Sequence, residues 1–236
     1  MSVPPSNRDG QSVRTLDQLL EVSVWSKDLT PEQLERVRAN IVVRDIPANS
    51  FAAHQGEPAD RWLGVIDGLL KLGLVDRAGK AATLLGVPQG SWFGEGSVLK
   101  GEPRRYDIIA LRDSRVAFMP ASTFHWLRDT SLAFNRFLVS QLNERLSHFI
   151  GTLAHERLMD PDARVAQAIA LMFNPHLHPV TETRLELSQE EIGSLAGISR
   201  QRVNRALHLL EGTGLLKVEY GTIVILDVKG LRQYGA

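Results

Sequence analysis

The sequence predicts an α+β protein with a β-barrel or jelly-roll domain, one long helix, and a C-terminal helical domain that ends in a β-hairpin. Three observations support this prediction. Short β-rich runs separated by glycines occupy residues 41–120, an apolar repeat of helical period follows, and two capped helices with a hairpin end the chain. With 236 residues and a hydrophobic share of 43%, the chain is long enough for two packed domains.

Two short helices are predicted before the first strand. Residues 1–14 hold several prolines and polar residues, so we expect a flexible N-terminus there. Thr15–Val22 and Thr30–Arg38 have helical patterns, and the second begins with an N-cap threonine followed by a first-turn proline. Order is therefore expected to begin near Thr15.

The middle of the chain is expected to form a small antiparallel barrel. Ten of the 19 glycines lie between Gly56 and Gly101, at the regular turn spacing of such a fold. We assign residues 15–128 to this domain. Its expected strands are Ile41–Val43, Trp62–Ile66, Leu69–Val75, Ala82–Val87, Ile108–Leu111 and Arg115–Met119.

A long helix is predicted over residues 129–160. Its apolar residues recur at alternating spacings of three and four, which is typical of a seam between two paired helices. A helix that only covers its own barrel is also amphipathic, so both interpretations stay open at this point. The candidate dimer-seam residues are Val139, Leu142, Leu146, Phe149 and Leu153.

A hinge is predicted where this helix ends. Asp160 followed by Pro161 is typical of an N-cap and a first-turn proline, which begin a new helix over Asp162–Phe173. A loop over Asn174–Pro179 follows. We therefore assign residues 161–236 to a separate C-terminal domain.

The C-terminal domain has the spacing of a winged helix-turn-helix. Ser188 and Glu191 form a capping box that opens a short helix, Gly197 ends it, and Ser199 caps a second helix. A hairpin with a Tyr-Gly turn between Leu215 and Leu226 provides the wing. The apolar faces expected to pack together are Ile192 and Leu195 on the first helix, and Val203, Leu207 and Leu210 on the second.

The second of these helices presents a polar face with no acidic residue before Glu211. Such a helix suits the major groove of DNA, since arginine contacts guanine bidentately and glutamine or asparagine contacts adenine. Surface arginines are usually just solvated, but the caps, the glycine and the hairpin together favour DNA binding. The start of the first helix also suits a phosphate, although capping explains Ser188 equally well. The predicted DNA-binding residues are Ser188, Gln189, Ser199, Arg200, Gln201, Arg202, Asn204 and Arg205.

Composition excludes several other classes of protein. The chain has no cysteine, which excludes disulfides, thiolate zinc sites and cysteine-ligated iron–sulfur clusters. It has 27 basic and 27 acidic residues, so DNA contact depends on local charge placement. No apolar run approaches the roughly 20 residues of a membrane span, and the N-terminus is polar, so we expect a cytoplasmic protein without a membrane partner. We expect no enzyme, catalytic residue or metal site, because no nucleophile–base set, carboxylate pair or phosphate loop is visible.

Together these motifs resemble the Crp-Fnr family of transcription regulators over nearly the whole chain. The resemblance depends on Gly56–Asp60, Val65–Gly68, Phe93–Glu95, the long helix and Ile192–Arg205. It implies a cyclic-nucleotide-binding type of barrel and long helices that pair as a homodimer. It also implies recognition helices that enter successive major grooves of a palindrome, where Arg200, Gln201 and Arg205 read bases, and RNA polymerase as a partner.

The expected effector pocket departs from the family's cyclic-nucleotide cassette. The Gly-Glu pair and an arginine are in place, but Tyr106 replaces a small residue. Phe149 and Ile150 stand where polar residues meet the purine, and burial of an unpaired amine costs about 1–3 kcal/mol. Haem lacks a recognisable pair of ligands. The candidate pocket residues are Gly94, Glu95, Arg104, Arg105, Tyr106, Phe149 and Ile150.

The function predicted from the sequence is a sequence-specific DNA-binding transcription regulator that acts as a homodimer. We expect no cofactor, and the barrel either binds an unidentified effector or is mainly structural. A cyclic-AMP-dependent regulator is the alternative. A pure cyclic-nucleotide-binding module is disfavoured, because such a module has no recognition helix.

Overall fold

Two antiparallel four-stranded sheets form the N-terminal domain of the computed structural model, which describes residues 15–75, 81–156, 160–179 and 183–235. One sheet has the order β1-β8-β3-β6 and the other β2-β7-β4-β5. Their facing surfaces bury a core that includes Leu63, Phe93 and Ile108, which confirms the predicted barrel. The strands are β1 (Val42–Ile46), β2 (Phe51–Ala53), β3 (Arg61–Asp67), β4 (Leu69–Val75), β5 (Ala81–Pro88), β6 (Trp92–Phe93), β7 (Asp107–Ala110) and β8 (Ser114–Pro120).

Six of these strands coincide with the runs expected from the sequence. The other two, β2 and β6, have three and two residues, which is too short for an alternating pattern to be visible. The predicted flexible stretch at residues 1–14 lies outside the described residues.

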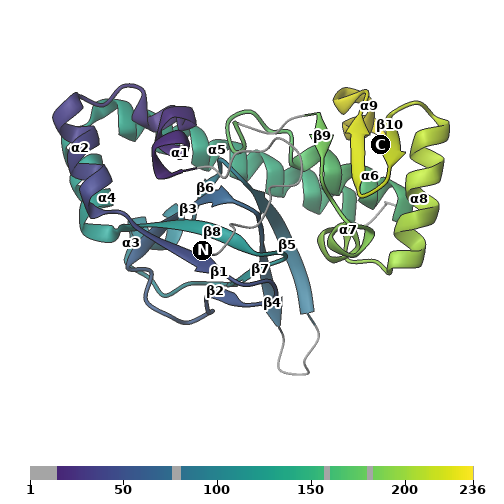
Figure 1. Cartoon of the computed structure of the whole chain (residues 1–236), viewed down its shortest axis with the longest axis horizontal. Helices are drawn as coiled ribbons and strands as arrows, with labels where there is room; N and C mark the ends of the chain where they lie inside the picture. Colours follow the sequence, from purple (N-terminus) through teal and green to yellow (C-terminus); the bar gives the residue numbers. More distant parts are fainter. Residues whose placement is uncertain (1–14, 76–80, 157–159, 180–182, 236) are drawn as a thin grey trace, which may run out of the picture.

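Helices pack on the sheet that contains β3 (Figure 1). The capping boxes at Thr15 and Thr30 open the first two of them, as expected for the second. A buried aromatic cluster joins them to the barrel, with the Trp25 ring 5.5 Å from that of Trp62 and 5.2 Å from that of Trp92. The helices of this domain are α1 (Leu16–Val22), the 3-10 helix η1 (Val24–Ser26), α2 (Pro31–Asn40), α3 (Glu95–Lys100) and α4 (Ala121–Thr130).

The long helix α5 (Leu132–Glu156) has two apolar faces. One face packs on the barrel through Phe134 and Leu138, which are buried. The other carries the expected seam, and its described residues from Val139 to Phe149 are exposed. Both interpretations of the periodicity therefore describe part of the same helix. The side chain of Leu153 lies outside the described residues.

The helix begins three residues later than the sequence analysis placed it. The preceding helix α4 continues to Thr130, and Ser131 then adopts an extended conformation with φ −123° and ψ 109°. This one-residue break separates α4 from α5.

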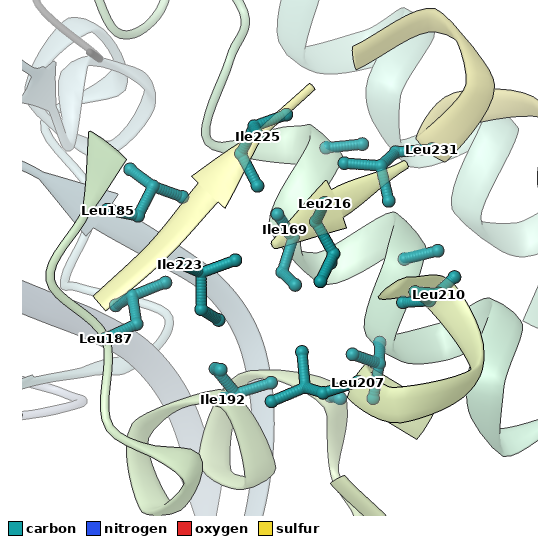
Figure 2. Packing of buried hydrophobic residues seen from close by; sticks show 14 of the residues in the cluster. Ile169, Leu185, Leu187, Ile192, Leu207, Leu210, Leu216, Ile223, Ile225 and Leu231 are labelled. Atoms are coloured by element: carbon teal, nitrogen blue, oxygen red, sulfur yellow. The ribbon is translucent and has the colours of Figure 1, made fainter. Parts of the chain in front are cut away.

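The C-terminal domain is a winged helix-turn-helix, as the sequence predicts. Its helices enclose a single apolar core with a small sheet of order β10-β11-β9. Figure 2 shows Ile169, Ile192, Leu207 and Leu216, from four different elements, around this core. The elements are α6 (Pro161–Leu171), β9 (Arg184–Leu185), α7 (Gln189–Ala196), α8 (Arg200–Gly212), β10 (Leu216–Glu219), β11 (Thr222–Ile225) and α9 (Val228–Gln233).

The predicted caps of this domain are confirmed in part. Ser188 and Glu191 form the expected capping box, and Gly197 ends α7 in the left-handed region with φ +64°. Asp160 and Ser199 occupy the N-cap positions of α6 and α8, but neither side chain makes a capping hydrogen bond. The predicted N-cap positions of α6 and α8 are therefore confirmed, without a side-chain hydrogen bond at either.

Candidate nucleic-acid interface and effector pocket

The turn between α7 and α8 fixes which face of α8 points outward. Gly193 of α7 lies so close to the turn that an added Cβ would stand 2.8 Å from the Ile198 carbonyl oxygen. Val203, Leu207 and Leu210 are buried in the shared core. Because these three residues occupy one stripe of α8, the remaining positions must face solvent.

That outward face carries the polar residues expected from the sequence. Arg200, Gln201, Arg202, Asn204 and Arg205 are all exposed. The Arg200 guanidinium lies 3.2 Å from the Glu190 carboxylate, which partly offsets its charge. Within the described part of the chain, Arg202 and Arg205 form no ion pair. The face is therefore positively charged even though the whole protein is neutral.

The start of α7 lies next to this face. The Gln189 amide donates to the Asn204 side-chain oxygen at 3.0 Å, so the two expected DNA-binding residues are directly joined. Ser188 uses its hydroxyl to accept from the Glu191 backbone N–H at 3.2 Å. Ser199 is exposed and makes no capping bond. The structure thus brings all eight expected residues to one end of the domain.

A groove of about 430 Å³ separates these helices from the wing. The start of α7, Arg200 and the β10–β11 turn line it. Tyr220 stands fully exposed at the turn, beside Gly221 with φ +70°. The turn is predicted from the sequence, but Tyr220 is not among the DNA-binding residues predicted from it. An apolar hairpin with an aromatic residue at its turn was the available signal.

The expected effector pocket contains a buried ion pair. Glu95 is 1% exposed at the start of α3, just after Gly94, which has φ +87°. The Arg145 guanidinium of α5 donates to Glu95 Oε1 at 2.5 Å and to the Trp92 carbonyl at 2.8 Å. Gln141 of the same helix donates to that carbonyl at 3.1 Å. The inside of the barrel and α5 are therefore directly connected.

The two candidate arginines of the pocket point in different directions. Arg104 is buried and donates to the Arg61 carbonyl at 2.8 Å, and burial lowers the pKa of its guanidinium. Arg105 is exposed and pairs with Glu102 at 2.7 Å. The structure therefore corrects the expectation that Arg105 belongs to the pocket. The chain bends at Arg105, just before β7, so the two neighbouring side chains leave the backbone in different directions.

Tyr106 lies among the charged groups of the pocket. Burial raises the pKa of its phenol, the Glu95 carboxylate raises it further, and the cationic side chains of Arg145 and Arg104 oppose these effects. The phenol therefore stays neutral near pH 7. Phe149 and Ile150 are instead 44% and 59% exposed on α5, on the side that carries the seam.

The described residues contain no group of three or more histidine, aspartate or glutamate side chains arranged to hold a metal ion. None of the helices described is long and apolar enough to cross a membrane.

Models of two protein families match the chain. A model of the cyclic nucleotide-binding domain matches residues 43–131, and a model of the Crp-like helix-turn-helix domain matches residues 144–234. The cAMP-activated global transcriptional regulator CRP of Salmonella typhimurium is 29% identical over 213 residues, which cover 87% of this chain and 100% of that protein. The CRP-like cAMP-activated global transcriptional regulator of Mycobacterium tuberculosis is 26% identical over 220 residues, 92% of this chain and 98% of the relative.

Solved structures of similar proteins support the same fold. FixK2 from Bradyrhizobium japonicum superposes with a TM-score of 0.66 at 21% identity, over 83% of this chain and 98% of that one. The c-di-GMP responsive global regulator CLP of Xanthomonas campestris has a TM-score of 0.58 at 23% identity, over 84% and 100% of the two chains.

Proposed function

The chain belongs to the Crp-Fnr family of DNA-binding transcription regulators, and on this basis we propose that it binds a palindromic DNA site as a homodimer. We assign residues 15–128 to the sensor, the helix α5 (Leu132–Glu156) to dimerisation and residues 161–236 to the DNA-binding domain. The observation that carries the proposal is the outward face of α8, where five polar side chains are exposed beside the start of α7.

Each part of the interface has a separate role in this proposal. Arg200, Gln201 and Arg205 read base edges in the major groove, while Arg202 and Asn204 support them. Ser188, Gln189 and Ser199 bind the phosphate backbone, and Tyr220 contacts it from the wing. The groove between α7, α8 and the wing is the place where one DNA strand passes.

The exposed apolar face of α5 provides the dimer contact. Val139, Leu142, Leu146 and Phe149 follow a spacing of three and four and are exposed in the single chain. An apolar row of this length on a surface helix marks a protein–protein interface.

We propose that the barrel does not bind cyclic AMP. Its Gly94-Glu95 pair fits a ribose, but Glu95 is held by Arg145, and Tyr106 lies close enough to Glu95 and Arg104 to interact electrostatically with both. The Tyr106 side chain packs against the core of the barrel, where we expect it to occupy volume that the nucleotide needs. The barrel therefore takes an effector of another chemistry or acts as a structural domain.

The remaining parts of the proposal follow from DNA binding. The protein regulates transcription without catalysing a reaction, contacts RNA polymerase when it activates, and works in the cytoplasm, where bacterial-type regulators meet their DNA.

The test is selection of bound duplexes from a random DNA pool by the purified protein, with and without cyclic AMP. We expect a two-fold symmetric site in both conditions. A strict requirement for cyclic AMP would instead establish the nucleotide-dependent alternative. No enrichment in either condition, with a folded dimer confirmed by light scattering, would contradict DNA binding by the effector-free protein.

A further inference from the structure

The barrel holds the first helix of the helix-turn-helix through an arginine. Arg112, in the turn between β7 and β8, donates from Nε to Glu191 Oε1 at 2.7 Å, and its Nη2 lies 2.7 Å from the same oxygen. The same guanidinium donates to the Glu186 carbonyl. The other carboxylate oxygen of Glu191 accepts from the Ser188 backbone N–H at 2.7 Å. Arg112 thus binds Glu191, which is part of the capping box at the start of α7.

A second polar contact lies about one turn further along α7. Lys71 of β4 donates to the Ser194 hydroxyl at 2.9 Å. Glu191 and Ser194 are three residues apart, so they lie on the same face of the helix. Two cations from the barrel therefore hold one face of α7 at two points, which resists rotation as well as separation.

Apolar contacts complete the same interface. Leu195 packs against Gly86 of β5, where an added Cβ would stand 2.7 Å from Leu195 Cδ2. Leu69 of β4 is 2% exposed and belongs to the core of the C-terminal domain, with Leu111 packed against it. Figure 1 shows α7 beside the sheet that contains β4 and β5. We name this interface the α7 dock; its residues are Leu69, Lys71, Gly86, Leu111 and Arg112 of the barrel with Glu186, Glu191, Ser194 and Leu195 of the C-terminal domain.

The α7 dock leaves the DNA-binding face open. It uses Glu191, Ser194 and Leu195, whereas Arg200 and Arg205 of α8 remain exposed. The start of α7 at Ser188 is exposed as well. These side chains therefore remain accessible to solvent while α7 is docked on the barrel.

We propose that Arg112 and Lys71 are positioning residues that hold the DNA-binding domain in the orientation that a dimer needs to bind both halves of its site at once. This inference depends on the proposed function. The two recognition helices of a dimer must reach half-sites about 34 Å apart, one helical turn of DNA. A domain held at two points keeps that spacing, whereas a released domain lowers the effective concentration of the second helix at its half-site.

The experiment compares full-length wild-type protein with Arg112→Ala and Lys71→Ala on three kinds of duplex. These are a single half-site, the selected palindrome, and palindromes whose central spacer is changed by one or two base pairs. We expect both variants to bind the half-site as wild type does. On the palindrome they bind about 5- to 150-fold more weakly, the usual range of a coupling between two sites. They also discriminate less between spacers, which a loss of folding would not produce.

Two further variants sharpen the comparison. Arg115→Ala is the matched control, because Arg115 is a barrel arginine whose partner is Asp45 of the same barrel, at 3.7 Å. We expect Arg115→Ala to bind all three kinds of duplex with the affinity of the wild type. Arg112→Lys keeps the positive charge but lacks the planar guanidinium that contacts Glu191 and the Glu186 carbonyl together. We therefore expect its affinity for the palindrome to lie between those of Arg112→Ala and the wild type.

The outcomes separate the inference from the function on which it depends. Failure of the wild type to bind either the half-site or the palindrome contradicts the proposed function. Unchanged palindrome affinity and spacer preference in both variants overturn the positioning role. Tighter binding by the variants overturns it as well, because the dock would then hold a non-binding orientation. If Arg112→Ala also weakens binding to the half-site, the result with Lys71→Ala is decisive, because the hydrogen bond of Lys71 to the Ser194 hydroxyl lies away from the capping box at the start of α7.

Discussion

Two carboxylates in this protein are held by arginines from elements distant in the sequence. Glu95 of α3 pairs with Arg145 of α5, and Glu191 of α7 pairs with Arg112 of the barrel. Both carboxylates are largely buried, and a buried charge requires a partner. Each pair therefore constrains how two elements can move relative to each other.

The Glu95–Arg145 pair gives a stability prediction at the residue scale. Arg145→Ala is expected to lower the free energy of unfolding by about 3–5 kcal/mol, because it leaves a buried carboxylate without its partner. Urea denaturation followed by tryptophan fluorescence measures this effect through the buried cluster of Trp25, Trp62 and Trp92. Arg128→Ala is the control, since its pair with Asp129 is exposed and screened by solvent, so its loss is expected to change stability little. Equal losses in the free energy of unfolding would show that the buried pair contributes no more to stability than the exposed pair.

Arg205 gives a recognition prediction at the same scale. It is exposed on α8 and, within the described residues, has no ion-pair partner. Arg205→Ala is expected to weaken binding to the selected site by about 1–3 kcal/mol and to relax preference at one base position of each half-site. Competition binding with single-base variants of the site measures both effects. Unchanged affinity and selectivity would remove Arg205 from the base-reading set.

At the scale of elements, α5 is the most informative part of the chain. One face meets the barrel through Phe134, Leu138 and Gln141, and another leaves Val139 and Leu146 exposed. Arg145 extends the barrel-facing side into the effector pocket. A movement of α5 therefore changes the pocket and the proposed dimer contact together. Such coupling is what an effector needs in order to shift the dimer between two conformations.

Charged substitutions in the seam of α5 test the proposed dimer contact. Leu146→Glu with Phe149→Glu is expected to give folded monomers, since like charges would face each other in the pair of helices. Sedimentation velocity measures the oligomeric state, and circular dichroism checks the fold. The control is Ser140→Glu with Ser147→Glu, two exposed positions on α5 outside the seam. A stable dimer of the seam variant would place the interface elsewhere.

At the scale of the whole molecule, charge is balanced and DNA recognition depends on where it is placed. The 27 basic and 27 acidic residues cancel, while α8 exposes three arginines on one face. The α7 dock sets the direction of that face relative to the barrel. Sensor, helix pair and DNA-binding domain therefore form one connected unit.

Thermal unfolding gives a test of the effector proposal at this scale. A ligand that binds only the native state stabilises it by about 2.7 kcal/mol at one hundred times its dissociation constant. We expect millimolar cyclic AMP to leave the Tm unchanged, because Tyr106 packs against the barrel core and Glu95 is already paired with Arg145. Differential scanning calorimetry measures the shift. A rise in Tm that grows with cyclic AMP concentration would contradict this expectation.

The barrel, the long helix and the winged helix-turn-helix can all be predicted from the amino-acid sequence alone. These depend on local signals: glycines at turns, apolar periodicity, and the capping box of Ser188 and Glu191. The outward face of α8 also follows from local spacing, because Val203, Leu207 and Leu210 form one stripe. Short elements such as β2 and β6 were missed because two or three residues show no period.

The partners of the charged residues depend on tertiary packing and cannot be predicted from local sequence patterns. Arg145 lies 50 residues from Glu95, and Arg112 lies 79 residues from Glu191, so no local pattern connects either pair. The choice of Arg104 over Arg105 for the pocket likewise depends on which side of its segment faces the barrel interior. Such contacts are set by how whole domains pack, because burial of a charge selects a partner through space and not through spacing along the chain.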